Sequence, residues 1–248
     1  MIVGRVAQLW RYPVKSMLGE RVHSLRLTRN GFDGDRRYAL RDPKSGRILS
    51  AKRESKLLQL RARSSDDGAW ITFPSGEEVS VEDPAAETRV TDWLGRPVEI
   101  ARPPSGRDRP QIESEEGTFL GRPGSFFDAR SVHLVTTSTL RALGDLYPAG
   151  SFDVRRFRPN LFLETPPELS GLVEETWEGR DLAIGAEALV GVVGPTSRCV
   201  LTTHAQEELA IDRDILRTVR AKNEGNVGVY AIVISEGAVS VGDEVDLP

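Results

Sequence analysis

Hydrophobic and polar residues alternate over short stretches of the N-terminal half, as where Leu25 and Leu27 share one face of residues 23–28. A period of two predicts β-strands, and clusters of turn-forming residues such as 42–46 separate them. The pattern predicts strands at 23–28 and 37–41, a hairpin that joins 70–73 to 79–81, and one helix at 84–94 with Gly95 as its C-cap.

The C-terminal half has a similar mixture of short strands and few helices. Strands are predicted at 132–136, 161–163 and 188–193. One helix is predicted with Thr137 or Ser138 as its N-cap, running to about Leu146, a second helix at 213–221, and a closing hairpin of 229–234 with 239–241. Residues 102–110 are rich in proline, glycine and charge and cannot form regular structure for long, so we place a boundary between domains 1–105 and 106–248. Many short strands with few helices predict a mainly β, barrel-like protein.

Composition excludes several classes of protein. The 248 residues include one cysteine, which rules out a disulfide framework, a cysteine zinc site and an iron–sulfur cluster. No apolar run reaches the roughly 18 residues of a membrane helix, and the first residues show no signal-peptide pattern. We therefore expect a cytoplasmic protein that does not bind a membrane.

Charge is distributed unevenly along the chain. Residues 1–63 contain 16 Lys or Arg and 5 Asp or Glu, although the whole chain has a net charge of −4. A positive block in a mildly acidic protein indicates an anionic ligand on the N-terminal part, or a surface complementary to an acidic partner domain. Nucleic acid is not expected, because the basic residues are not interleaved with aromatic residues that could stack on bases.

Cys199 is the first candidate for chemistry. The adjacent Arg198 favours the thiolate, which binds soft metals or acts as a nucleophile, and nearby hydroxyls could donate to a ligand. The alternative is an inert, buried thiol that behaves as a small hydrophobic residue.

Basic residues near turns form the second set of candidates. Lys15 and Ser16, after a Tyr-Pro-Val segment, pair a cation with a hydroxyl that suits a phosphate, and Arg36 follows a turn-rich segment. Arg158 and Asn160 could grip a planar polar ligand, or could be a structural ion pair and a turn residue.

Four motifs in order resemble the MOSC family, the relatives of the C-terminal domain of molybdenum cofactor sulfurase. They are Tyr12-Pro13-Val14-Lys15-Ser16, Gly34-Asp35-Arg36-Arg37, Phe157-Arg158-Pro159-Asn160 and Ser197-Arg198-Cys199-Val200-Leu201-Thr202-Thr203. The likeness is to the two-part type that includes amidoxime-reducing proteins. It implies an N-terminal MOSC β-barrel packed against a MOSC β-barrel domain with a few short helices. The chain departs from the family pattern after Thr203, where it reads His204-Ala205-Gln206.

The resemblance implies that Cys199 ligates molybdenum held by a pterin cofactor, or carries sulfur for that cofactor. It implies that Lys15, Ser16 and Arg36 bind the cofactor's phosphate and that Arg158 and Asn160 hold its pterin, and it matches Asp128 to an acid near the metal. Further cofactor contacts are expected from Lys52, Thr136, Ser138, Thr196, Ser197 and Arg198.

The activity that this resemblance implies is reduction of small N-hydroxylated or other N-oxygenated compounds by the molybdenum cofactor. The chain lacks cysteines for an iron–sulfur domain, so electrons are expected from a separate reductase. The main alternative is a carrier of the cofactor or of persulfide sulfur, and the remaining one is a binding protein with an inert Cys199.

Overall fold

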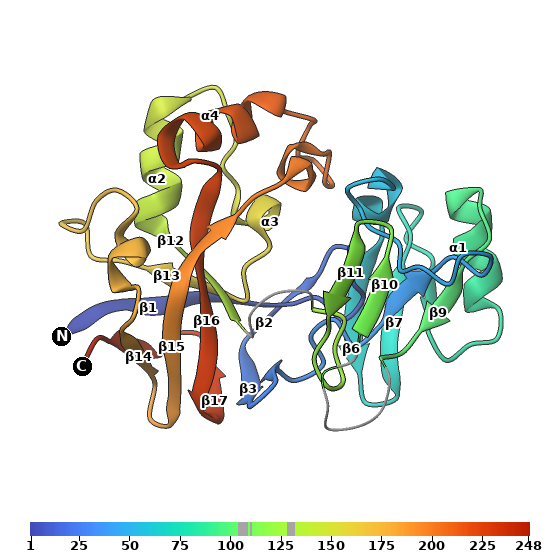
Figure 1. Ribbon diagram of the computed structural model, residues 1–248, viewed down its shortest axis with the longest axis horizontal. Coiled ribbons are helices and arrows are strands. Elements are labelled where there is room, and N and C mark those ends of the chain that lie inside the picture. Colours follow the sequence, from blue (N-terminus) through green and yellow to red (C-terminus); the bar gives the residue numbers. More distant parts are fainter. Residues whose placement is uncertain (104–108, 110, 128–131) are drawn as a thin grey trace.

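A computed structural model describes residues 1–103, 109, 111–127 and 132–248 of the chain. Seven of its strands close into a β-barrel that fills one half of the molecule (Figure 1). Around the barrel the order is β1 (Ile2–Arg11), β18 (Glu244–Asp246), β14 (Asp181–Ile184), β15 (Ala188–Ser197), β16 (Asn226–Ser235), β12 (Val132–Thr136) and β13 (Leu161–Glu164), which pairs again with β1. The mainly β prediction is confirmed.

Strand β1 closes this barrel although it comes from the opposite end of the chain. It pairs with β18 and β13 in the barrel and with β2 (Glu20–Val22) beyond it. Its buried residues Val3, Val6 and Leu9 lie three positions apart, because register irregularities interrupt the pairing on both sides. Strict alternation of apolar and polar residues therefore does not predict this strand.

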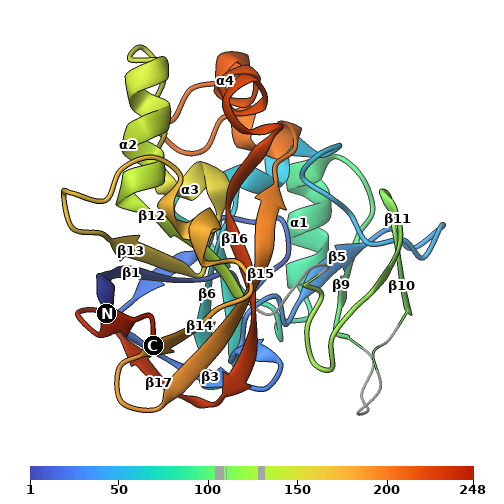
Figure 2. The same ribbon diagram turned by 60° about the vertical axis from the view of Figure 1, so that its left-hand side comes forward.

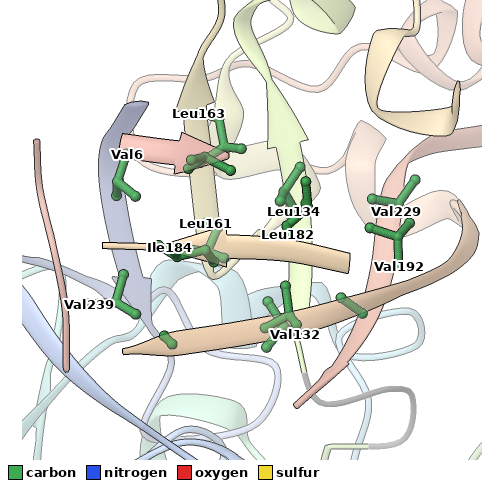
Figure 3. Packing of buried hydrophobic residues seen from close by; sticks show 14 of the residues in the cluster. Val6, Val132, Leu134, Leu161, Leu163, Leu182, Ile184, Val192, Val229 and Val239 are labelled. Atoms are coloured by element: carbon green, nitrogen blue, oxygen red, sulfur yellow. The ribbon is translucent and has the colours of Figure 1, made fainter. Parts of the chain in front are cut away.

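The barrel core consists of aliphatic side chains from every barrel strand (Figure 3). Val6, Leu134, Leu161, Ile184 and Val229 are each 1% exposed or less. At roughly 1.5–3 kcal/mol for each buried aliphatic side chain, this core is a main source of the barrel's stability.

Helices lie over one end of the barrel (Figure 2). They are α2 (Thr137–Leu146), α3 (Val154–Phe157) and α4 (Arg213–Asn223), with the 3₁₀ turns η2 (Val173–Trp177) and η3 (Val200–Thr203) nearby. The N-cap of α2 is Thr136, whose Oγ1 accepts a hydrogen bond from the amide of Thr139. The prediction of Thr137 or Ser138 as the cap was wrong by one or two residues, because the chain turns immediately after β12.

The other half of the molecule is built from small antiparallel sheets around a second core (Figure 1). The sheets are β6 (Arg61–Ser65), β7 (Gly68–Thr72) and β8 (Glu78–Ser80); β5 (Ala39–Arg41) with β9 (Glu99–Ala101); and β10 (Gln111–Ser114) with β11 (Gly117–Leu120). The 3₁₀ turn η1 (Ser55–Gln59) and helix α1 (Ala86–Leu94) complete it. Gly95 caps α1 at a φ of 74°, which confirms the predicted helix end.

The predicted closing hairpin does not form. Strand β17 (Gly237–Ser240) pairs instead with β3 (Ser24–Thr28), which in turn pairs with β4 (Gly31–Phe32). The prediction was wrong because β17 takes its partner from β3, near the opposite end of the chain, and local alternation does not record such a long-range pairing.

The two halves of the sequence exchange elements in space. β1 and β3 pair with C-terminal strands, whereas Ile112 of β10 packs with Ala39 and Ala101 in the N-terminal half. The proposed boundary between 105 and 106 lies outside the described residues and stays a prediction. Within the described part of the chain, no helix has both the length and the apolar character needed to cross a bilayer.

Candidate functional site

A cavity of about 390 Å³ lies where the barrel meets the N-terminal half. This volume falls within the roughly 300–1,000 Å³ of small-molecule sites. One part of its wall comes from the N-terminal half and the β10–β11 turn, and the other from barrel strands, α3 and η3. The lining residues are Lys15, Ser16, Arg36, Ser50, Lys52, Ser114, Glu116, Phe127, His133, Phe157, Arg158, Ser197, Arg198, Cys199, Leu201 and Tyr230.

Three lining residues adopt left-handed backbone conformations that non-glycine residues rarely take. Their φ angles are 69° for Ser16, 51° for Arg36 and 53° for Arg158. Such conformations cost on the order of 1–3 kcal/mol each and concentrate at functional sites. Hydrogen bonds hold the two arginines in place: the Arg36 amide donates to Tyr12 O at 2.8 Å, and the Arg158 amide donates to Val154 O at 3.2 Å.

Among the described residues, five cations line the cavity, together with one carboxylate, that of Glu116. Arg36 forms an ion pair with Asp35, which is itself buried, and Lys52 pairs with Glu116 at 3.5 Å. The other three cations donate hydrogen bonds to backbone carbonyl oxygens. Lys15 donates to Phe126 O (3.1 Å), Arg158 to Met17 O (2.6 Å) and Arg198 to Phe157 O (2.7 Å). The cavity is therefore electropositive and suited to an anion.

Burial changes the proton affinity of two of these arginines. It lowers the pKa of Arg158 to about 10, and the neighbouring charges of Arg36 and Arg198 act in the same direction. Burial also lowers the pKa of Arg198. With a pKa of about 10, Arg158 remains charged at neutral pH and can hold an anion there.

Cys199 lies between the end of β15 and the start of η3. Its thiol belongs to the cavity wall and is partly exposed. Its carbonyl accepts hydrogen bonds from the amide and hydroxyl of Thr202, which fix the turn that follows. Among the described residues there is no group of three His, Cys, Asp or Glu side chains that could hold a metal ion. A metal at Cys199 would thus need ligands from outside this part of the chain.

Two family models match the chain on either side of the predicted boundary. The MOSC domain matches residues 121–246, and the MOSC N-terminal beta barrel domain matches residues 3–96. The chain belongs to the MOSC family. MOSC domains are associated with the molybdenum cofactor, so membership indicates a function related to that cofactor.

The comparison with solved structures finds matches of low sequence identity to this MOSC protein. YuaD from Bacillus subtilis is 13% identical over 98% of this chain and 93% of its own, with a TM-score of 0.49. YiiM from Escherichia coli is 15% identical over 98% of this chain and 69% of its own, with a TM-score of 0.44. YiiM from Geobacillus stearothermophilus is 17% identical over 58% and 73%, with a TM-score of 0.37. No curated protein matches the chain.

Most of the predicted site residues of this MOSC protein meet at the cavity. Residues from motifs more than 180 positions apart line the same space: Lys15, Ser16, Arg36, Lys52, Arg158, Ser197, Arg198 and Cys199. The fold thereby brings the single cysteine and the N-terminal cations together, as the motif order led us to expect.

Four predicted residues do not line the cavity. Thr136 caps α2 and donates to Glu174, and Ser138 donates to Gly171 O at 2.8 Å. Asn160 is fully buried, where its amide group donates to Trp10 O and accepts from the His133 amide. Thr196 is also fully buried, and its Oγ1 has no hydrogen-bond partner among the described residues. Asp128 lies outside the described residues.

Sequence reasoning missed half of the cavity wall. His133 was interpreted as an ordinary strand residue, and the hairpin that supplies Ser114 and Glu116 was not predicted. The aromatic residues Phe127 and Tyr230 do not belong to any of the four motifs. They meet Cys199 at the cavity only in the folded protein, so no local signal could have found them.

Proposed function

We propose that this cavity binds the pterin molybdenum cofactor, with the thiolate of Cys199 as a protein ligand of the metal. We further propose that the protein reduces small N-oxygenated compounds. The observation that carries the proposal is that one soft-metal ligand and five cations line one cavity.

The residues present fit such a group. Nε of Arg198 is buried and has no hydrogen-bond partner among the described residues. A residue of the cavity wall therefore has one donor whose hydrogen bond is not made within the protein. The surplus of cations suits a phosphate-bearing ligand. Because the described residues offer no complete metal site, a cofactor that brings its own sulfur ligands matches a wall with a single thiol.

Each part of the wall has a separate task in this proposal. Lys15 and Arg36 bind the phosphate, and Arg158 and Arg198 hold the polar edge of the pterin. The apolar side chains of Phe127, Phe157 and Leu201 exclude water from the part of the cavity that they line.

When bound, the cofactor supplies two-electron oxygen-atom transfer at the metal. Reduction of an N–OH group to N–H consumes two electrons and two protons and releases the oxygen as water. A separate reductase would deliver the electrons, and a cytoplasmic location would suit such a partner. The Cys199 thiolate would remain the fixed protein ligand throughout.

A Cys199→Ser variant tests the proposal. Wild-type protein from a host able to make the cofactor is expected to contain molybdenum and pterin and to reduce an amidoxime with a chemical electron donor. Cys199→Ser is expected to lose this turnover, because a hydroxyl is a poor ligand for a soft site. Val200→Ala, a change in the exposed neighbour, is expected to keep it.

Metal analysis and mass spectrometry distinguish the outcomes. A Cys199→Ser protein that is fully active and loaded with molybdenum would refute the role of the thiolate. A wild-type protein that carries one extra sulfur atom on Cys199 and no molybdenum would favour sulfur transfer instead. The partly exposed thiol in an anion-binding cavity is compatible with that second function.

A further inference from the structure

Aromatic rings and guanidinium groups alternate behind the cavity wall. The Cζ atom of Arg36 lies 4.2 Å from the ring centroid of Phe127 and 4.5 Å from that of Tyr12. The Cζ atom of Arg158 lies 4.2 Å from the same Tyr12 ring. The Tyr12 ring therefore contacts two guanidinium groups, one from each half of the sequence.

The positive charges of Arg36 and Arg158 repel each other, and the Tyr12 ring offsets part of this repulsion. Arg36 and Arg158 are 6% and 7% exposed, so water screens their mutual repulsion poorly. Arg36 forms an ion pair with the carboxylate of Asp35, whereas the Arg158 guanidinium donates a hydrogen bond to a carbonyl oxygen, Met17 O. The electron-rich face of an aromatic ring attracts a cation, and more strongly where both are desolvated.

We propose that Tyr12 is a positioning residue that holds Arg36 and Arg158 against its ring, so that both guanidinium groups are preorganised for an anion in the cavity. Tyr12 is not among the residues that line the cavity, so it acts through the two arginines. This inference rests on the proposed function in one respect: the natural anion would be the phosphate-bearing cofactor.

Contacts from both halves of the molecule fix the ring. The Tyr12 amide donates to Asp35 Oδ1 at 2.9 Å, and its hydroxyl donates to the carbonyl of Pro159 at 3.1 Å. Trp10 stacks on it with a centroid distance of 6.4 Å. Gly19 leaves room for the ring, because a Cβ atom there would lie 2.5 Å from Tyr12 Cδ1. A side chain held so tightly can set the positions of the arginines that it contacts.

Anion affinity in the full-length protein tests this role. Cys199 is the only cysteine and lies in the same cavity, so protection of its thiol from alkylation reports binding of inorganic phosphate. We expect Tyr12→Leu to weaken phosphate binding about tenfold, the effect of losing two desolvated cation–aromatic contacts. Tyr12→Phe keeps the ring, and we expect its affinity to stay within about threefold of wild type.

A matched control separates positioning from general destabilisation. Trp70→Leu removes a cation–aromatic contact with Arg63, at 5.2 Å, in the β6–β7–β8 sheet outside the cavity. We expect it to leave phosphate affinity unchanged even if it lowers the unfolding temperature. If Tyr12 were merely a core residue, Tyr12→Leu would likewise lower stability without changing the affinity of the folded protein.

Several outcomes would overturn the proposal. Wild-type affinity in folded Tyr12→Leu would do so, as would the same loss in Tyr12→Phe. If Tyr12→Leu does not fold, Phe127→Leu removes the ring on the other side of Arg36, and unchanged affinity there would contradict the model of alternating rings and cations. Absence of phosphate binding by the wild type would also refute it, whereas the molybdenum content of the purified protein decides the proposed function separately.

Discussion

Backbone conformation at single residues is what shapes the cavity wall. Ser16, Arg36 and Arg158 accept left-handed backbones that glycine would adopt more easily, and each of them lines the cavity. In the function that we propose, glycine could not replace them, because their hydroxyl and guanidinium groups contact the bound anion. Strain at these positions is therefore balanced by the packing and hydrogen bonds of their surroundings.

Gly228 shows the opposite case, in which only glycine fits. Its φ is 74°, and a Cβ atom would lie 2.7 Å from Val135 Cγ2 and 2.9 Å from His133 Nε2. We expect Gly228→Ala to lower the free energy of unfolding by about 3 kcal/mol or more, since a left-handed alanine costs roughly 1–2 kcal/mol and overpacking adds roughly 1–3 kcal/mol.

Urea denaturation of Gly228→Ala and Gly95→Ala measures the two contributions separately. Gly95 has the same φ of 74°, but nothing lies within 4 Å of its added Cβ atom. We expect Gly95→Ala to cost only the conformational part, about 1–2 kcal/mol. Equal losses in the two variants would show that crowding at β16 contributes nothing.

At the scale of elements, short polar motifs fix where helices and turns begin and end. The turn at 42–46, predicted from its composition, is held by Asp42 Oδ1, which accepts from the amides of Lys44 and Ser45 at 2.9 Å each. Oδ2 of Asp42 binds Arg96, which follows α1, at 2.6 Å. One carboxylate thus connects a turn to the end of a helix more than 50 residues away.

This carboxylate makes stability depend on pH. Its hydrogen bonds with Ser45 and Arg96 lower the pKa of Asp42 from 3.8 to about 2. A lowered pKa in the folded protein means that the stabilisation is fully present above about pH 4 and is lost as the pH falls through about 2. We expect Asp42→Asn to be less stable than wild type near neutral pH, with a difference that shrinks over that range.

Thermal unfolding of both proteins at a series of pH values measures this difference. Asp92→Asn, at an exposed position of α1, serves as a control that does not alter the turn. A stability difference between Asp42→Asn and wild type that stays constant from pH 6 to about pH 2 would contradict the assignment.

At the scale of the whole molecule, the N-terminal strand is part of the C-terminal barrel. β1 covers the edges of both β13 and β18, and the chain ends meet through hydrogen bonds between Met1 and Leu247. The ion pair of Glu207 with Arg61 connects the two halves a second time. The molecule is therefore expected to fold as one cooperative unit rather than as two independent domains.

A fragment of residues 121–248 tests this interdependence. Without β1 the barrel has two open strand edges, and part of its core is exposed to water. We expect the fragment to show no cooperative thermal transition by circular dichroism, and fusion to residues 1–28 to restore one. A fragment that melts cooperatively at the wild-type temperature would show that the barrel does not need β1.

Local patterns along the chain predicted much of the fold and half of the residues that line the cavity. Alternation and turn residues were sufficient to predict β3, β7, β8, β12 and β13, and the presence of helices α1, α2 and α4 was also predicted, although the N-cap of α2 was not. Motif order and charge were sufficient to select Cys199, Lys15, Arg36 and Arg158, because unusual residue types in short segments are visible without any contact map. Asn160 shows the limit of prediction from residue type. Its side-chain amide could bind a ligand, but in the structure it forms hydrogen bonds with the backbone of Trp10 and His133.

The sequence by itself determined that the protein is mainly β, that its N-terminal part is cationic and that it has one thiol for chemistry. These properties depend on residue type and local spacing, which can be read along the chain. Only the tertiary structure decided that β1 closes the barrel, that β17 pairs with β3, and that Tyr12 lies between two arginines. Those outcomes depend on which strand edges are already occupied and which distant side chains meet, and no local pattern records either.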